Sequence, residues 1–289
     1  MKPKLTLLLS LTFLFLFSGS VYGQEEVKKE YYDNGKLKSE VHWKDGKQEG
    51  LGTWWFESGE KYSEVHYKNG KKDGLETLWY SFGKKISESH YKNGKKDGLE
   101  TLWDKFGKKI SEYKNGKKDG LETEFDNDGK KTLEREYKEN KIEGLFTIWS
   151  KSGKKQSEGY TKNGEWEGLV TFWYENGEKK HEIPFKNGKK EGLEKRWYKS
   201  GKKSGELYYK NDKSIGLYTS WYETGEKEYQ VHYKNGEKEG VYKEWYKSGR
   251  KKSLKHYKNG KENGLRKKWD EDGTLTYEGN YIDGAEEIK

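Results

Sequence analysis

The chain of 289 residues contains no cysteine, only two prolines and few aliphatic residues. Without cysteine it can form neither a disulfide framework nor a cysteine-ligated zinc site, and it has no thiol nucleophile. Hydrophobic residues make up 29% of the chain and charged residues 38%, a balance typical of highly solvated or disordered chains. The composition therefore argues against an ordinary globular core.

Aromatic residues and glycine are abundant instead. The chain has 12 Trp, 23 Tyr and 36 Gly, and aromatic residues make up 16% of the total. Disordered chains are poor in aromatic residues, and large rings bury much area per residue. We therefore expect a thin but ordered structure that a few large side chains hold together.

A Gly-Leu dipeptide, once Gly-Val, recurs every 24 residues, with a single step of 22. Its glycines are Gly50, Gly74, Gly98, Gly120, Gly144, Gly168, Gly192, Gly216, Gly240 and Gly264. A second glycine ladder begins at Gly35, and a third follows Asn or Asp, with Asn140 and Asp212 in place of glycine. Because Asn and Asp tolerate positive φ, the third ladder predicts a left-handed turn position.

Two short segments per repeat lie between the glycines, as in residues 169–174 and 229–233. They are rich in β-branched and aromatic residues, and Asn-Gly between such segments is a strong hairpin signal. Glycine at these intervals would break helices. The pattern predicts an all-β fold, an elongated single-layer antiparallel β-hairpin meander of about twenty strands. The 22-residue step fits, because a deletion of two keeps side chains on their faces.

One position, five residues after the Gly-Leu glycine, is always aromatic. Its occupants are Trp55, Trp79, Trp103, Phe125, Trp149, Trp173, Trp197, Trp221, Trp245 and Trp269. These rings form either a core or a binding platform, and we favour the core because they recur with the period of the scaffold. A bulged loop would put the second aromatic, Tyr67, on the face of Trp55, and an even loop would put Tyr62 there; we favour the bulge.

No catalytic, metal or cofactor site is evident. Five histidines share one repeat position: His42, His66, His90, His232 and His256. Equivalent residues of neighbouring repeats lie roughly 9.6 Å apart, which is too far for a shared metal ion, so we expect solvated strand positions. The glutamates also recur by unit and favour cross-strand charge pairs. We predict a protein that is not an enzyme and has no cofactor.

The N-terminus has the pattern of an export signal. Lys2 and Lys4 precede an apolar run over residues 5–17, and small residues lead to a cleavage site after Gly23. The run is short for a membrane span, and an uncleaved anchor is the alternative. The predicted organisation is a signal peptide (1–23), a short lead (24–30), tandem repeats (31–284) and a tail (285–289). We expect a secreted or periplasmic protein.

Lysine pairs such as Lys71-Lys72 occupy the turns on both rims of the predicted sheet. They either keep a long sheet soluble, which we favour, or attract anionic lipid heads, cell-wall polymers or acidic proteins. Nucleic acid fits poorly with an exported protein. We expect a protein partner first, and a cell-wall polymer or an anionic membrane surface as alternatives.

The unit Tyr67-Lys68-Asn69-Gly70-Lys71-Lys72-Asp73-Gly74-Leu75, followed by an aromatic residue and then Ser-Gly or Asn-Gly, resembles the MORN repeat. It is most similar to the bacterial MORN-variant repeat of proteins labelled YwqK-family antitoxins, over residues 31–284. The resemblance implies an antiparallel hairpin meander with a protein-binding or membrane-associated role and no enzymatic activity in the repeats. A signal peptide is unexpected for the partner of a cytoplasmic toxin.

Three functions follow. The first is an exported, non-enzymatic protein-binding or scaffolding module at the cell envelope. The second is an antitoxin-like partner that neutralises a toxin, and the third is a repeat that binds cell-wall glycan or anionic lipid.

Overall fold

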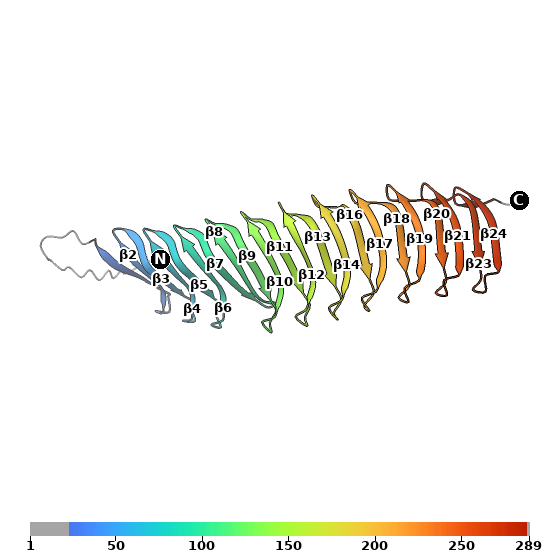
Figure 1. The fold of residues 1–289 in the computed structure, drawn as a ribbon. Helices are drawn as coiled ribbons and strands as arrows, with labels where there is room; N and C mark the ends of the chain where they lie inside the picture. Colours follow the sequence, from blue (N-terminus) through green and yellow to red (C-terminus); the bar gives the residue numbers. More distant parts are fainter. Residues whose placement is uncertain (1–22, 288–289) are drawn as a thin grey trace, which may run out of the picture. The chain divides into compact units, whose positions relative to one another are not determined.

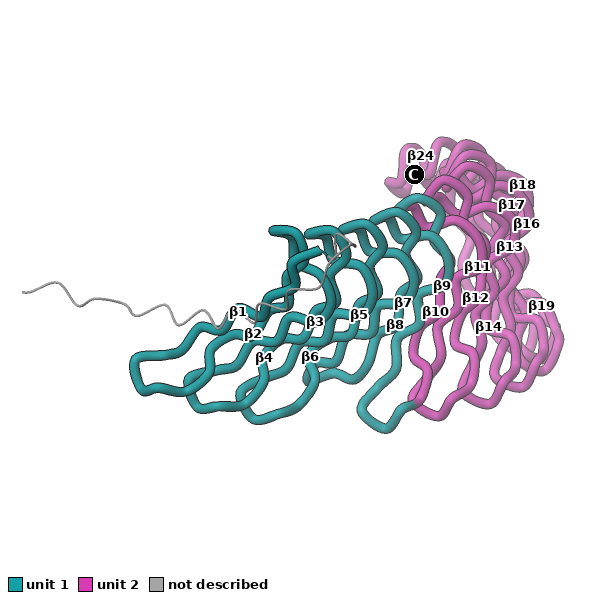
Figure 2. Tube along the Cα trace, turned by 90° about the vertical axis from the view of Figure 1, so that its left-hand side faces the viewer, with its two compact units in different colours: residues 1–129, 137–140 teal, residues 130–136, 141–289 magenta. Residues whose placement is uncertain are grey.

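The computed structural model describes residues 23–287, and its regular elements are all β-strands (Figure 1). The predicted signal peptide lies outside the described residues except for Gly23. No helix long and apolar enough to cross a membrane is found in the described part of the chain. The described residues divide into two compact units, which Figure 2 shows in teal and magenta.

Unit 1 comprises residues 1–129 and 137–140. Each of its strands pairs antiparallel with the next strand in the chain. The strands are β1 (Glu25–Tyr31), β2 (Leu37–Lys44), β3 (Lys47–Trp55), β4 (Lys61–Lys68), β5 (Lys71–Trp79), β6 (Lys85–Lys92), β7 (Lys95–Asp104), β8 (Gly107–Lys114) and β9 (Lys117–Phe125).

Unit 2 comprises residues 130–136 and 141–289. Its strands are β10 (Lys131–Lys138, whose last two residues belong to unit 1), β11 (Lys141–Trp149), β12 (Lys155–Lys162), β13 (Glu165–Trp173), β14 (Lys179–Lys186), β15 (Lys189–Lys190), β16 (Gly192–Trp197), β17 (Lys203–Lys210), β18 (Lys213–Trp221), β19 (Lys227–Lys234), β20 (Glu237–Trp245), β21 (Lys251–Lys258), β22 (Lys261–Glu262), β23 (Gly264–Trp269), β24 (Leu275–Ile282) and β25 (Ala285–Glu286). From β11 onward the pairing is again antiparallel and sequential. The predicted all-β hairpin meander is confirmed within each unit.

The Asn-Gly connections are two-residue turns with positive φ at both positions, as in a type I′ hairpin. Asn93 and Gly94 have φ values of 51° and 84°, and the flanking Lys92 and Lys95 pair directly. Asn140 and Asp212, which replace the turn glycine, have φ values of 70° and 66°. The left-handed turn position predicted from the sequence is therefore confirmed.

The connections at the opposite rim are three-residue loops followed by a bulge. Between β3 and β4, the Gly59 amide donates to the Phe56 carbonyl at 2.9 Å, and the Phe56 amide donates to the Glu60 carbonyl at 2.8 Å. The register then shifts, because Trp55 pairs with Lys61 but Trp54 pairs with Ser63. The loop and the bulge together leave an even number of residues between the paired Trp54 and Ser63.

This register places Tyr67 on the face opposite Trp55. The Tyr67 ring lies 6.3 Å from the ring of Trp54, and Trp55, the next residue, points to the other face. The expectation that a bulge would put Tyr67 beside Trp55 is wrong, because the register shift beside Trp55 comes in addition to the odd, three-residue loop. We call the side that carries Tyr67 the tyrosine face and the side that carries Trp55 the tryptophan face.

The 22-residue unit loses both residues from its connection. Asp104 pairs with Gly107 across a two-residue turn, and the register runs without a bulge to the pair of Gly98 with Tyr113. The Asp104 carboxylate accepts hydrogen bonds from the amides of Phe106 and Gly107 at 2.7 and 3.1 Å. Strand alternation is preserved as predicted, but the deletion shortens the loop and leaves strand β8 as long as β6.

Pro184 lies within β14, where proline cannot donate a ladder hydrogen bond and a local break is typical. The break is in the facing strand, between β15 and β16, where the Glu191 amide donates to the Pro184 carbonyl at 3.0 Å. The same break recurs between β22 and β23, where the Asn263 amide donates to the His256 carbonyl. The irregularity therefore belongs to the repeat, and proline occupies a position where the ladder is already interrupted.

One row of buried side chains runs across the middle of the tyrosine face, and we call it the middle row. In unit 1 each member pairs directly with the next, and all are buried: Val41, Gly52, Val65, Glu76, Ser89, Glu100, Ser111 and Glu122. In unit 2 the buried hydrophobic residues at the equivalent positions are Val170, Ile183, Leu207, Tyr218 and Val231.

Candidate binding surfaces

The row of ten aromatic residues predicted as core or binding platform lies on the tryptophan face, and every member is half-buried. In unit 2 a lysine of the preceding repeat covers the ring: the Lys203 Nζ is 5.2 Å from the centroid of Trp221, and the Lys131 Nζ is 5.0 Å from that of Trp149. Lys203 also forms an ion pair with Glu206 at 2.8 Å. Each such ring is thus ordered by a lysine and keeps part of its surface exposed.

A second aromatic ladder, which sequence reasoning missed, follows the tryptophans. In unit 2 the hydroxyl of Tyr198 donates to the carbonyl of Trp221 in the next repeat at 2.7 Å. Tyr174, Tyr222 and Tyr246 make the same bond at 2.8 Å to Trp197, Trp245 and Trp269. The signal in the sequence was a tyrosine directly after tryptophan at 24-residue intervals. These hydroxyls tie consecutive repeats together at the loop rim.

The middle row of unit 1 buries carboxylates beside lysines. Glu76 lies 2.5 Å from the Lys72 Nζ, Glu100 forms an ion pair with Lys96, and Glu122, 0% exposed, forms one with Lys118. The serines opposite donate to two of them, Ser89 to Glu100 at 3.2 Å and Ser111 to Glu122 at 2.7 Å. Each buried glutamate of this row therefore has a lysine four residues earlier that compensates its charge.

Tyrosine rings cover these ion pairs. The Lys72 Nζ lies 5.0 Å from the Tyr91 ring centroid, and the Lys96 Nζ lies 5.2 Å from that of Tyr113. Burial, together with the nearby Glu76 carboxylate, raises the pKa of Tyr91, and burial together with Glu100 raises the pKa of Tyr113. Both phenols therefore stay protonated at neutral pH.

In unit 2 the tyrosines of this face pack against one another. Successive ring centroids of Tyr218, Tyr229, Tyr242 and Tyr257 lie 5.2, 5.6 and 6.2 Å apart. Burial, reinforced by Glu262, raises the pKa of Tyr257 to about 12. The cluster joins the hydrophobic core of Leu207, Tyr218 and Val231.

A further bulge lies at the Gly-Leu dipeptide, because Val65 pairs with Glu76 but Tyr67 pairs with Lys72. The repeated histidine lies over this bulge. The Nδ1 atoms of His66, His90 and His256 lie 3.2, 3.0 and 2.8 Å from the carbonyl of the leucine that follows the facing glycine. His66 and His90 are exposed strand residues, as expected for this position, and they also contact a backbone carbonyl at the bulge. Within residues 23–287 no group of three or more potential metal ligands is found.

The acidic residue before the bulge glycine holds the next Asn-Gly turn. The Asn93 amide donates to the Asp73 carboxylate at 2.9 Å, and the Gly94 amide donates to the Lys72 carbonyl at 2.8 Å. The same carboxylate contact recurs from Asn69 to Glu49, Asn115 to Asp97, Asn163 to Glu143, Asn187 to Glu167, Asn211 to Glu191 and Asn259 to Glu239. The acids of the Asn-Gly-Lys-Lys-Asp-Gly loop therefore stack the turns along one edge, which we call the Asn-Gly rim.

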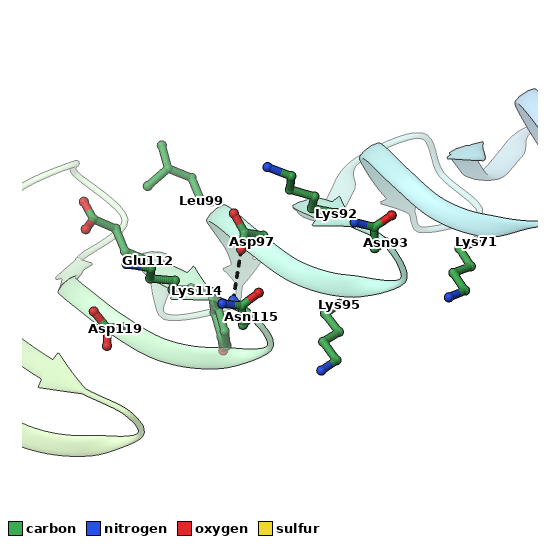
Figure 3. A pocket seen from close by; sticks show the side chains of 12 residues that line it. Lys71, Lys92, Asn93, Lys95, Asp97, Leu99, Glu112, Lys114, Asn115 and Asp119 are labelled. Atoms are coloured by element: carbon green, nitrogen blue, oxygen red, sulfur yellow. Dashed lines mark hydrogen bonds between the residues drawn. The ribbon is translucent and has the colours of Figure 1, made fainter. Parts of the chain in front are cut away.

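Lysines flank the turns of this rim, and a hollow of about 910 Å³ lies among them in unit 1 (Figure 3). Lys71, Lys92, Lys95 and Lys114 contribute to its lining, together with Asp97 and Leu99. In Figure 3 the side chains of Lys71 and Lys95 point the same way, and the Asp97 carboxylate is occupied by the Asn115 amide. The hollow thus combines exposed ammonium groups with acids that already have partners.

Comparison with known proteins identifies the repeat. A model of the MORN repeat variant family matches nine segments, residues 27–45, 48–69, 72–93, 118–139, 166–187, 190–211, 215–235, 238–259 and 262–283. The 22-residue unit falls between the third and fourth matches. No curated protein sequence matches the chain.

Two solved structures resemble most of the chain at low similarity. A crystal structure of TcdB2-TccC3 is 10% identical, with a TM-score of 0.21, over 90% of this chain and 18% of the other. A crystal structure of TcdB2-TccC3-Cdc42 is 9% identical, with a TM-score of 0.20, over 90% of this chain and 17% of the other. The chain thus spans under a fifth of the length of these proteins.

Proposed function

The chain belongs to the MORN repeat variant family, and from that premise we propose that it is an exported, non-enzymatic scaffolding module that binds a protein partner at the cell envelope. Repeats of this family are generally modules that bind proteins or membranes. The tryptophan face is the surface that we assign to the partner.

The half-buried row of aromatic residues carries this proposal. Tryptophan is enriched at the energetic centres of protein interfaces, where a large ring is partly ordered before binding and is surrounded by polar residues. In unit 2 the rings of Trp149 and Trp221 have that arrangement, with lysine and glutamate beside them. Within a unit, equivalent rings lie two strands apart, roughly 9.6 Å, which suits a partner with an extended surface.

A binding role also agrees with the partners of the polar side chains. The glutamates of the middle row are held by lysines, the acids of the Asn-Gly rim by turn amides, and three of the repeated histidines by backbone carbonyls. Each arrangement recurs from repeat to repeat as part of the scaffold. A catalytic pair would require two groups distinguished from their repeats by their environment.

Location at the envelope is proposed from the export pattern of residues 1–23. It is tested by sequencing the N-terminus of the protein recovered from separated cell fractions. We expect a mature chain that begins at Gln24 in the envelope or secreted fraction. A chain that retains Met1 and remains in the cytoplasm would refute this part of the proposal.

The partner surface is tested by photocrosslinking in the native cell. A benzophenone side chain replaces Trp79 in unit 1 or Trp221 in unit 2, and circular dichroism confirms that each variant folds. The controls carry the same group at Phe82 or Phe106 of unit 1, which are 68% and 71% exposed at the loop rim. We expect one discrete protein adduct from the tryptophan positions and none from the controls.

Equal adducts from all four positions, or none from the tryptophan positions of a folded and exported protein, would contradict the assignment of this face. If the captured protein is a toxin, coexpression then tests the narrower antitoxin role, with rescue of growth as the required result.

A further inference from the structure

We propose that the Asn-Gly rim of unit 1 is a docking line for a linear, phosphate-bearing polymer. This inference concerns a different surface from the tryptophan face and does not depend on the protein partner proposed for that face. It rests on the arrangement of charge along the rim.

Each of the first four turns of this rim, all in unit 1, is flanked by two lysines that pair directly across the hairpin. In unit 1 the pairs are Lys44 with Lys47, Lys68 with Lys71, Lys92 with Lys95, and Lys114 with Lys117. Like charges directly opposite one another destabilise an antiparallel pair. Four consecutive hairpins nevertheless carry the same unfavourable pair, which indicates that the charge serves a purpose other than stability.

Glu49, Asp73 and Asp97 of the same rim form no ion pairs with these lysines among the described residues. Glu49, Asp73 and Asp97 accept hydrogen bonds from the amides of the following turns. Lys44 and Lys117, at the two ends of the rim, form ion pairs with Glu25 and Glu139. The six lysines between them are exposed, and none has a carboxylate within ion-pair distance among the described residues: Lys47, Lys68, Lys71, Lys92, Lys95 and Lys114.

The lysines after the turns are laid along the rim in order. A Cβ placed on Gly94 would lie 3.7 Å from the Cβ of Lys71, and one placed on Gly116 would lie 3.7 Å from the Cβ of Lys95. Each lysine stem therefore rests beside the glycine of the next turn, and the ammonium groups follow one another at roughly 9.6 Å. The hollow of about 910 Å³ lies among four of these lysines (Figure 3).

A linear polymer fits this arrangement better than a membrane does. Surface-binding segments of membrane proteins add Trp, Phe or Leu that enter the acyl boundary, whereas the turn tips of this rim are Asn-Gly or Asp-Gly. All eight flanking residues are lysine, whose ammonium group acts as a point charge and does not demand the fixed geometry of a bidentate contact. Phosphates spaced along a flexible chain could thus engage successive pairs.

Unit 2 provides an internal control. It keeps three such lysine pairs, Lys186 with Lys189, Lys210 with Lys213 and Lys258 with Lys261. Their row is interrupted, because Glu165 faces Lys162 and Glu237 faces Lys234. Each of these glutamates occupies the position of Lys71 or Lys95, beside the glycine of the next turn. We therefore assign the polymer to unit 1.

The test measures binding of the mature full chain to long-chain inorganic polyphosphate by fluorescence anisotropy at several salt concentrations. Release of counterions from six contacts predicts that log Kd rises with log salt concentration with a slope of about 4. The double variant Lys71→Glu/Lys95→Glu copies the substitution present in unit 2, and we expect it to weaken binding at least tenfold. The matched control Lys189→Glu/Lys213→Glu makes the same charge change in unit 2, and we expect less than a threefold effect.

Circular dichroism and thermal unfolding establish that both double variants fold. Equal weakening by the two variants would overturn the proposal, since binding would then follow net charge alone. No salt-dependent binding to polyphosphate would also overturn it. Vesicles of phosphatidylglycerol are the second probe, and rim-dependent binding to them without binding to polyphosphate would replace the polymer with a membrane surface.

Discussion

The two units fill the same row of the tyrosine face with different chemistry. Unit 1 places Glu76, Glu100 and Glu122 there, whereas unit 2 places Val170 and Tyr218 at two of the equivalent positions. A lysine stands four residues before each glutamate, and it is replaced by Trp166 and Ser214 where the row is apolar. The same backbone therefore accommodates apolar or acidic side chains in this row, provided that a neighbouring cation compensates each buried carboxylate.

Unit 2 also has one buried glutamate in this row, and it too lies beside cations. Glu194 is 2% exposed and lies 3.3 Å from the Lys190 Nζ and 2.5 Å from the Arg196 Nε. Lys238 precedes an apolar member of the row, and its Nζ lies over the rings of Tyr242 and Tyr257 instead. The pairing of lysine and glutamate is therefore a local device of single repeats rather than a property of one unit.

The largest effect should come from placing a glutamate in the apolar row without its lysine. Tyr218→Glu removes a ring from the core of Leu207 and Val231 and buries a charge, and we expect it to lower the free energy of unfolding by about 3 to 5 kcal/mol. Adding Ser214→Lys supplies the missing cation and should recover part of the loss. Urea denaturation measures both, with Ser214→Lys alone as the control. A double variant no more stable than Tyr218→Glu would break the rule.

The converse change removes the cation from unit 1. Lys96→Met removes the cation beside the buried Glu100 carboxylate, and we expect a loss of about 2 to 3 kcal/mol, discounted for the partial exposure of the lysine. Lys96→Met/Glu100→Leu gives the repeat an apolar filling like that of unit 2 and should restore stability to near the natural level. Hydrogen exchange of peptides from unit 1 reports the change locally. A double variant as unstable as Lys96→Met would show that the ion pair contributes more than compensation.

The hairpins and turns could be predicted from the sequence because the Asn-Gly turn is determined by local chemistry. Positive φ at Asn93 and Gly94 follows from residue type, and so does the tolerance for Asn140 and Asp212. The face of Tyr67 could not be predicted in the same way. It depends on a second bulge beside Trp55 that no glycine marks.

The roles of the polar side chains were also hidden by the repeat. Asp73 bonds to a turn 20 residues later, and His90 to a carbonyl across a bulge, so neither contact is visible in local spacing. The pair of Lys96 and the buried Glu100 was visible as a spacing of four residues, but we assigned the lysines of the turns to solubility. Alternation alone does not tell which face of a single sheet is buried when both faces carry aromatic rings.

The tyrosine ladder offers a smaller test of the same comparison. Tyr198→Phe removes one hydrogen bond between repeats of unit 2 and should cost about 1 kcal/mol. In unit 1 Tyr32 makes the equivalent bond to Trp55, but Phe56 occupies the next position and has no hydroxyl. Phe56→Tyr should therefore increase protection from hydrogen exchange in unit 1. Loss of protection in the Phe56→Tyr variant would argue that the ladder requires more than the hydroxyl.

The smallest expected effect is a change in how stability depends on pH in the acidic range. Burial acts to raise the pKa of Glu194, but hydrogen bonding and charge from Arg196 and Lys190 outweigh it and hold the pKa below the ordinary value of 4.5. A carboxyl whose pKa is lowered by folding contributes stability above its unfolded pKa, and that contribution is lost as the pH falls through the folded pKa. The natural chain should lose more stability between pH 5 and pH 3 than Glu194→Gln, measured by urea denaturation at each pH. Identical pH profiles would show that Glu194 is held no more favourably than in the unfolded chain, and the rule that a lysine or arginine compensates each buried glutamate would then fail in unit 2.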